Sequence, residues 1–218
     1  FEESFTEGKE TRRRLVIVTG KKGTGKTRLL NEMKYYSQLQ NIPVRNYRQY
    51  LESDQRPEKY ILLIDQADLG MDSINEVMHE LHEKDVLIVW ATEKNPKTSA
   101  NHILIELKNY THEQLKKYLE SVTGLSDAPK ELIDEVYSRT QGNPLFVTEF
   151  IKSLLNQGAL FDSVGKWDAT TFKDIQIDFN QIDIPGSIEE ILLRKFEKLS
   201  ESQKKIVTVL ALHGEELK

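Results

Sequence analysis

One short segment, residues 16–27, limits what this chain can fold into more than any other. It reads Val-Ile-Val-Thr-Gly-Lys-Lys-Gly-Thr-Gly-Lys-Thr, an apolar run that stops at Gly20 and continues as G-x-x-x-x-G-K-T. This pattern predicts a buried strand, a loop whose backbone wraps a phosphate chain, and a helix that begins directly after the loop. A glycine- and lysine-rich surface turn is the plain alternative, but the strand pattern before the motif and the helical pattern after it favour a phosphate loop.

The residues of this loop are the first candidate ligand-binding residues. Glycine at 20, 23 and 25 lets the backbone turn tightly and approach phosphate oxygens closely. Lys26 is expected to reach the β- and γ-phosphates, and the Thr27 hydroxyl is expected to bind Mg²⁺. The candidate nucleotide-binding residues of the segment are Gly20, Lys21, Lys22, Gly23, Thr24, Gly25, Lys26, Thr27 and Arg28.

Strand and helix patterns alternate through the first half of the chain, which predicts an α/β fold with a parallel sheet and helices on both faces. Strands are expected at 15–19, 44–50, 60–65, 86–90 and 103–107. Helices are expected after the loop, with an apolar stripe at Leu29, Leu30, Met33 and Tyr36, and from a Ser73–Glu76 capping box, with a stripe at Ile74, Val77, Met78 and Leu81. A ligand of such a sheet lies outside the carboxyl ends of the strands.

The second half of the chain has helical patterns. Thr111 with Gln114, Pro129, Pro144, Ser187 with Glu190, and Ser200 with Gln203 each mark a helix start. Gly158 is expected to end the helix that Pro144 begins, and residues 160–167 resemble a small hairpin.

Asp65 ends the third expected strand, where a carboxylate that holds Mg²⁺ directly or through water is needed; a turn-capping aspartate is the alternative. The next residue is Gln66, which can position water but cannot accept its proton. Asp68 is two residues further on and either substitutes as a base or only precedes the helix. Asp65, Gln66 and Asp68 are therefore catalytic candidates.

Two more candidates are expected at strand ends. Thr92 follows the fourth strand, so its hydroxyl could bond the γ-phosphate or the attacking water, and Lys94 could add positive charge; an ordinary loop is the alternative. In the second half, Pro144 either packs on an adenine base or simply begins its helix.

Composition excludes several classes of protein. The net charge is −5, so the chain does not look like a nucleic-acid binder as a whole. The basic cluster at residues 11–14 is interpreted as a solvated strand entry rather than a nucleic-acid patch. There is no cysteine, which fits the cytoplasm, and no apolar run as long as a membrane helix, so no membrane partner is expected. Because Phe1 is not an initiator methionine, we expect a fragment of a longer protein.

Four segments in this order resemble the STAND branch of the AAA+ ATPases: residues 20–27, residues 61–68, Thr140–Phe150 and Ile184–Leu192. The resemblance implies a P-loop core at 1–108, a helical lid with a hairpin at 109–180, and the start of a winged-helix domain at 181–218. It also implies that the ligand is ATP or ADP with Mg²⁺. By the same resemblance, Lys26 and Thr27 bind phosphate and Mg²⁺, and Asp65 is the Walker B acid. Lys94 lies near the sensor position of the family, and Pro144 contacts the nucleotide. Gln66 stands where the family usually has a second acid, and the interval from Lys26 to Asp65 is short for the family.

The expected function is an ATP-binding regulatory switch with slow hydrolysis, which works with other domains of its polypeptide and forms a homo-oligomer in the ATP state. Two alternatives remain open. One is a DNA-linked AAA+ ATPase of the replication-initiator or transposition-helper type. The other is a scaffold that holds nucleotide without hydrolysing it.

Overall fold

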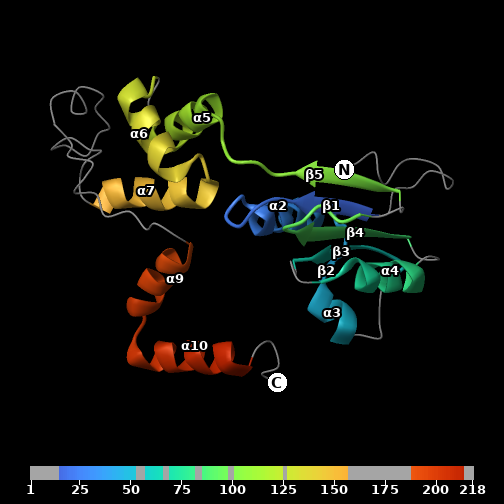
Figure 1. The fold of residues 1–218 in the computed structure, drawn as a ribbon. Helices are drawn as coiled ribbons and strands as arrows, with labels where there is room; N and C mark the ends of the chain where they lie inside the picture. The colour runs from blue at the N-terminus through green and yellow to red at the C-terminus, as the bar shows by residue number, and fades with distance from the viewer. Residues whose placement is uncertain are drawn as a thin grey trace. The chain divides into compact units, whose positions relative to one another are not determined.

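The computed structural model describes residues 15–52, 57–65, 69–81, 85–97, 101–124, 127–156 and 188–213 (Figure 1). The chain forms two compact units, Phe1–Asn109 and Tyr110–Lys218. Each unit is built around buried apolar residues of its own.

The first unit is a five-stranded sheet in the order β2-β3-β4-β1-β5. Its strands are β1 (Leu15–Thr19), β2 (Val44–Asn46), β3 (Lys59–Ile64), β4 (Asp85–Thr92) and β5 (His102–Glu106). Every pair of neighbouring strands is parallel, which confirms the predicted parallel sheet. The strand that precedes the glycine-rich loop, β1, lies inside the sheet between β4 and β5.

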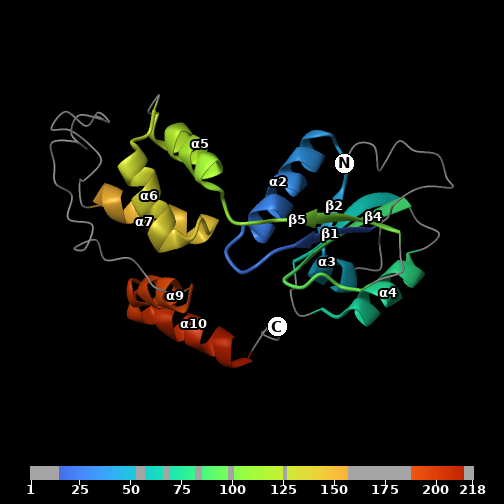
Figure 2. The same ribbon diagram turned by 45° about the horizontal axis from the view of Figure 1, so that its top comes forward.

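Helices cover both faces of this sheet, as predicted. On one face, Leu15 and Ile17 share an apolar cluster with Tyr50 of α3 (Tyr47–Glu52) and Ile74 of α4 (Met71–Glu80). On the other face, Val16 and Val18 pack in a cluster with Leu30 of α2 (Lys26–Leu39). Figure 2 shows α2 on one side of the sheet and α3 and α4 on the other. Because successive side chains point to opposite faces, the continuous apolar runs of β1 and β3 are buried throughout.

The predicted strand over 44–50 is wrong beyond Asn46. The Asn46 side chain accepts a hydrogen bond from the Gln49 backbone N–H at 2.8 Å, and the Gln49 side chain accepts one from the Asn46 N–H at 3.0 Å. This reciprocal pair is a capping box, so the chain leaves the sheet and begins α3 at Tyr47.

Three smaller expectations in the first unit also need correction. The predicted Ser73–Glu76 capping box does not form, because α4 begins at Met71 with Gly70 as its N-cap and Ser73 already lies within the first turn. Thr92 does not follow the fourth strand but is its last residue, because β1 pairs with β4 as far as Thr92. Tyr36 does not join the buried stripe of α2 and is 44% exposed.

The second unit is helical in the part described. Its helices are α5 (His112–Thr123), α6 (Lys130–Thr140), α7 (Pro144–Asn156), α9 (Ile188–Glu197) and α10 (Glu201–His213). The predicted capping boxes at Thr111–Gln114 and Ser200–Gln203 are confirmed, and Pro144 begins α7 as predicted. Gly158, the expected hairpin at 160–167 and the Ser187 cap lie outside the described residues.

A single apolar cluster holds α5, α6 and α7 together, with Leu115, Val136 and Phe150 fully buried. An ion pair joins α9 to α7, because Lys195 contacts the Glu149 carboxylate at 3.2 Å. Within the described parts of both units, no helix has the length and apolarity needed to cross a membrane.

Candidate functional site

The glycine-rich loop leaves the carboxyl end of β1 and ends where α2 begins. Gly23 and Gly25 have φ angles of +82° and +99°, in the left-handed region that favours glycine. The Thr24 hydroxyl donates a hydrogen bond to the Lys21 carbonyl at 2.8 Å, which closes the turn between them. The loop therefore has the tight, glycine-dependent conformation that the motif predicts.

Gly20 is required where the loop leaves the sheet. Its φ is +156°, and a Cβ at this position would lie 2.7 Å from the Leu107 carbonyl oxygen and 2.6 Å from the Thr24 hydroxyl. The Leu107 N–H donates to the Thr19 carbonyl at 2.8 Å. The start of the loop is thus fixed against the segment that follows β5.

The Lys26 side chain folds back over the loop. Its ammonium donates to the carbonyl oxygens of Gly20 at 2.7 Å and Lys21 at 3.1 Å. An ammonium group has three N–H donors, so these two contacts leave one for a ligand. A fixed positive charge therefore lies within the loop itself, where the motif predicts a phosphate contact.

The beginning of α2 favours an anion. Its N-cap, Gly25, supplies no side chain to the free backbone N–H groups, and the first turn contains no acidic residue. Thr27 and Arg28 lie exposed in this first turn, and Lys21 and Lys22 are exposed on the loop. The described residues around the loop thus present N–H groups, positive charge and a hydroxyl to solvent.

A cavity of about 450 Å³ lies beside the loop. This volume is within the range typical of small-molecule sites. The lining residues come from the loop, from the residue after β4, and from the last residue of β5 with the segment after it: Gly20, Lys21, Thr24, Glu93, Glu106, Leu107, Lys108 and Asn109. The phosphate loop therefore adjoins a space large enough for part of a nucleotide.

The sheet brings several predicted site residues to one edge. Asp65 directly follows β3 and is exposed, and Thr92, at the end of β4, pairs with Thr19 at the end of β1. Because β3, β4 and β1 are parallel neighbours, these carboxyl ends lie along the edge from which the loop emerges. Thr92 is only 4% exposed, whereas Lys94, two residues later, is exposed. Gln66 and Asp68 lie outside the described residues.

Among the described residues, no group of three or more His, Asp or Glu side chains could hold a metal on its own. A Mg²⁺ site does not need such a group, because Mg²⁺ is usually bound by one or two protein groups together with substrate phosphates and waters. Thr27 and Asp65 supply a hydroxyl and a carboxylate of that kind.

Pro144 lies in the second unit, at the first position of α7. The turn before it is closely held. The Asn143 side chain accepts a hydrogen bond from the Leu145 N–H at 3.0 Å, and the Gly142 carbonyl accepts one from the Tyr110 N–H at 2.8 Å. The expectation that Pro144 begins a helix is confirmed, and its role toward a nucleotide stays a prediction.

Sequence reasoning missed Glu93 and the segment Glu106–Asn109 as residues that line a cavity beside the loop. They lie at or directly after the carboxyl ends of β4 and β5, so the rule that ligands bind at strand carboxyl ends could have found them. It did not single them out, because it needs the strand order, and the sequence does not reveal that β5 is the neighbour of β1.

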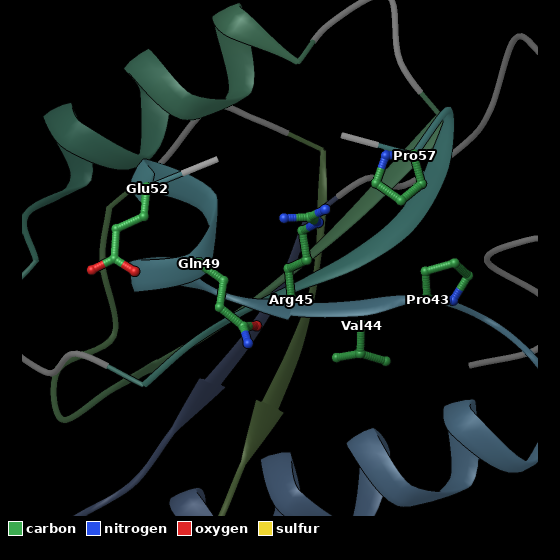
Figure 3. A pocket seen from close by; sticks show the side chains of 6 residues that line it. All are labelled: Pro43, Val44, Arg45, Gln49, Glu52 and Pro57. Atoms are coloured by element: carbon green, nitrogen blue, oxygen red, sulfur yellow. The ribbon is translucent and has the colours of Figure 1, made fainter. Parts of the chain in front are cut away.

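A second cavity, of about 540 Å³, lies beside β2, the outermost strand on the other side of the sheet from β5 (Figure 3). It is lined by residues from β2, α3 and the start of the segment leading into β3: Pro43, Val44, Arg45, Gln49, Glu52 and Pro57. None of the predicted site residues lines it, and β3 and β4 separate β2 from β1 in the sheet.

Solved structures of nucleotide-binding proteins resemble this chain. The replication initiator DnaA bound to AMPPCP and single-stranded DNA is 17% identical with a TM-score of 0.52, and the match covers 72% of this chain and 59% of that one. AMPPCP-bound DnaA from Aquifex aeolicus is 17% identical with a TM-score of 0.50, over 72% and 60% of the two chains. The fold is that of an AAA+ P-loop NTPase. This confirms the predicted fold class, while the chain spans only about 60% of the length of the DnaA chains that it matches.

The STAND resemblance has a structural counterpart among the solved structures. A signal transduction ATPase with numerous domains (STAND) from Pyrococcus horikoshii, which carries a tetratricopeptide repeat sensor, is 13% identical with a TM-score of 0.50. The match covers 92% of this chain and 32% of that one. A sequence family described as a domain of unknown function (DUF8739) matches residues 111–163, and no curated protein sequence matches the chain. At these identities the comparisons establish the AAA+ fold and leave its STAND branch as a proposal.

Proposed function

We propose that this chain binds ATP and ADP with Mg²⁺ at the phosphate loop and acts as a nucleotide-dependent switch module of a STAND-type signalling protein. The observation that carries the proposal is the loop itself. Its left-handed glycines and the Lys26 ammonium, 2.7 Å from the Gly20 carbonyl, surround the start of a helix that has no side-chain cap. That arrangement suits a polyphosphate.

The proposed roles rest on the motif and, where the structure describes a residue, on its position. The loop amides from Gly20 to Gly25, with Lys21, Lys22, Lys26 and Arg28, hold the phosphates, while Thr27 and Asp65 hold the metal. When bound, Mg²⁺ neutralises charge on the β- and γ-phosphates. We assign Thr92, the last residue of β4, and Lys94, two residues later, to the γ-phosphate side of the site, and Gln66 and Asp68 to the attacking water.

The switch needs a second part that responds to the nucleotide. We assign residues 1–108 to the nucleotide-binding core, 109–180 to a helical lid that bears Pro144, and 181–218 to the start of a winged-helix domain. ATP favours an open arrangement that assembles into homo-oligomers, and ADP favours a closed one, through differential contacts to the γ-phosphate. Gln66 in place of an acid makes turnover slow, which suits a switch. We also assign the module to the cytoplasm.

The binding test compares Lys26→Ala with Lys34→Ala, which removes the same charge from an exposed position further along α2. Loss of a charge-assisted hydrogen bond of about 1.5–3 kcal/mol predicts roughly 10- to 150-fold weaker ATP binding for Lys26→Ala. Isothermal titration calorimetry with ATP and Mg²⁺ measures both variants. Equal affinities in the wild type and Lys26→Ala would refute the proposed site.

A turnover assay separates the switch from a scaffold that never hydrolyses its nucleotide. We expect slow but measurable phosphate release from the wild type, and faster release from Gln66→Glu because a carboxylate can accept the proton of water. No release from either protein, with nucleotide still bound, favours the scaffold.

A DNA-linked ATPase is the second candidate, because one similar structure is a replication initiator bound to single-stranded DNA. The net charge of −5 argues against it. Fluorescence anisotropy with single-stranded and duplex DNA at increasing salt tests this candidate, since binding through phosphate contacts weakens steeply with salt.

A further inference from the structure

The cavity beside the phosphate loop lies mainly on the β5 side of β1. The proposed metal and γ-phosphate groups, Asp65 and Thr92, follow β3 and β4, whereas most of the cavity lining outside the loop follows β5. In the sheet order, β4 and β5 flank β1 on opposite sides. A nucleotide whose γ-phosphate points toward β3 and β4 therefore directs its nucleoside toward the end of β5.

Glu106, the last residue of β5, is held in a fixed relation to the loop. It pairs with Thr19, the residue just before Gly20, and the next residue, Leu107, donates its N–H to the Thr19 carbonyl at 2.8 Å. Gly20 has no room for a side chain against the Leu107 carbonyl. The backbone of Glu106 thus cannot shift without moving the phosphate loop.

The chemistry of Glu106 selects what it can bind. A carboxylate repels phosphate oxygens, so the part of a nucleotide beside it must offer hydrogen-bond donors. The two hydroxyls of a ribose are such donors, and an acidic side chain near a phosphate-binding turn holds the ribose 2′-hydroxyl in dinucleotide-binding folds. Lys108 contacts one Glu106 oxygen at 3.0 Å, and both side chains are more than half exposed, at 71% and 60%. Because a carboxylate has about four acceptor positions, that contact leaves room for a ligand.

We propose that Glu106, oriented by Lys108, binds the ribose hydroxyls of the nucleotide, so that the site prefers ribonucleotides to 2′-deoxyribonucleotides. This inference rests on the proposed function, because it concerns how the same nucleotide is held. It assigns the cavity at the end of β5 to the sugar.

The test measures ATP and dATP affinities by calorimetry, with Mg²⁺, for the wild-type chain, Glu106→Gln and Glu93→Gln. Glu93 lines the same cavity but follows β4, so it is the matched control. Replacing Glu106 also releases Lys108, which changes the attraction for both triphosphates equally, so the ratio of the two affinities is the quantity to compare. We expect the wild type and Glu93→Gln to prefer ATP by about tenfold, the value of one hydrogen bond to a charged group. We expect Glu106→Gln to bind both nucleotides within about threefold.

The other outcomes distinguish a failure of this inference from a failure of the proposed function. Tight ATP binding with no preference over dATP, or an unchanged preference in Glu106→Gln, overturns the inference and leaves the proposed function standing. Loss of the preference in Glu93→Gln instead assigns the sugar to the other carboxylate and also overturns it. Inosine triphosphate is the base control: a Glu106→Gln effect on ATP against ITP alone means that Glu106 contacts the base amine, not the sugar. No binding of any nucleotide to the wild type overturns the proposed function and the inference with it.

Discussion

Two glycines of the helical unit allow a sharp test of how tightly the turn before Pro144 is held. Gly142 and Gly124 each follow a helix and have nearly equal φ angles, +68° and +71°. A Cβ added at Gly124 meets nothing within 4 Å, whereas one added at Gly142 overlaps the Tyr110 carbonyl oxygen. The two substitutions to alanine therefore share their backbone strain and differ in the contact with Tyr110.

The free-energy difference follows from these terms. An alanine in the left-handed region costs about 1–2 kcal/mol at either position. At Gly142, relief of the overlap adds about 1–3 kcal/mol. The shift also weakens the hydrogen bond from the Tyr110 N–H to the Gly142 carbonyl, which is worth about 1 kcal/mol. We therefore expect Gly142→Ala to destabilise the helical unit by about 2–4 kcal/mol more than Gly124→Ala.

Hydrogen exchange measured by mass spectrometry suits a chain with two units, because each unit reports its own opening free energy. The slowest amides of α5, α6 and α7 should exchange about 30- to 900-fold faster in Gly142→Ala than in Gly124→Ala. Amides of β1 and β4, in the other unit, should be unaffected in both variants. Equal exchange rates in the two variants would refute the reasoning, because it would mean that Tyr110 does not hold the turn.

Three further predictions concern single contacts. Gly20→Ala should destabilise the sheet unit by about 1–3 kcal/mol in urea unfolding and weaken ATP binding. Gly70→Ala is the control and should be near neutral, because a Cβ there meets open space and the φ angle is −73°. Equal effects of the two substitutions would contradict the packing at Gly20. Thr111→Ala removes the hydroxyl that accepts the Gln114 N–H, one half of a capping box, and should cost about 1 kcal/mol in the exchange of α5. A change below a few tenths of a kcal/mol would contradict the cap. Burial raises the pKa of the Glu149 carboxyl, but hydrogen bonds from Lys152 and Lys195 outweigh it, so the pKa in the folded unit lies below the usual 4.5. The helical unit should therefore lose about 1 kcal/mol or less of stability as the pH falls from 4.5 through that lowered pKa. Glu149→Gln should flatten that acid limb, and an unchanged limb would show that the pair does not stabilise the unit.

Local patterns predicted the parts of this fold that depend on local interactions. The Thr111–Gln114 and Ser200–Gln203 caps, the start of α7 at Pro144 and the buried run of β3 all follow from residues near one another in the chain. One error arose where two local signals competed. The strand expected over residues 44–50 ends after three residues, because the Asn46–Gln49 capping box begins a helix there.

The site was predictable only as far as the motif extends. The loop, Lys26 and the position of Asp65 after β3 follow from the sequence, because each is marked by its neighbours. The place of β5 beside β1 does not, because it depends on pairing between segments far apart in the chain. Because of that pairing, Leu107 leaves no room for a side chain at Gly20, and the Glu106 carboxylate lies beside the loop.

The segment Leu107–Tyr110 connects these observations. Its first residue donates a backbone hydrogen bond to Thr19, immediately before the phosphate loop, and its last donates one to Gly142, two residues before Pro144. Each end is thus fixed to a different proposed nucleotide-binding element, one in each unit. Only Lys108 and Asn109 lie between these anchors, and both line the cavity beside the loop. A ligand in that cavity would therefore lie against the two residues that join these anchors. For the proposed switch this placement is relevant, because a ligand shifts a conformational equilibrium only through contacts that differ between the two states.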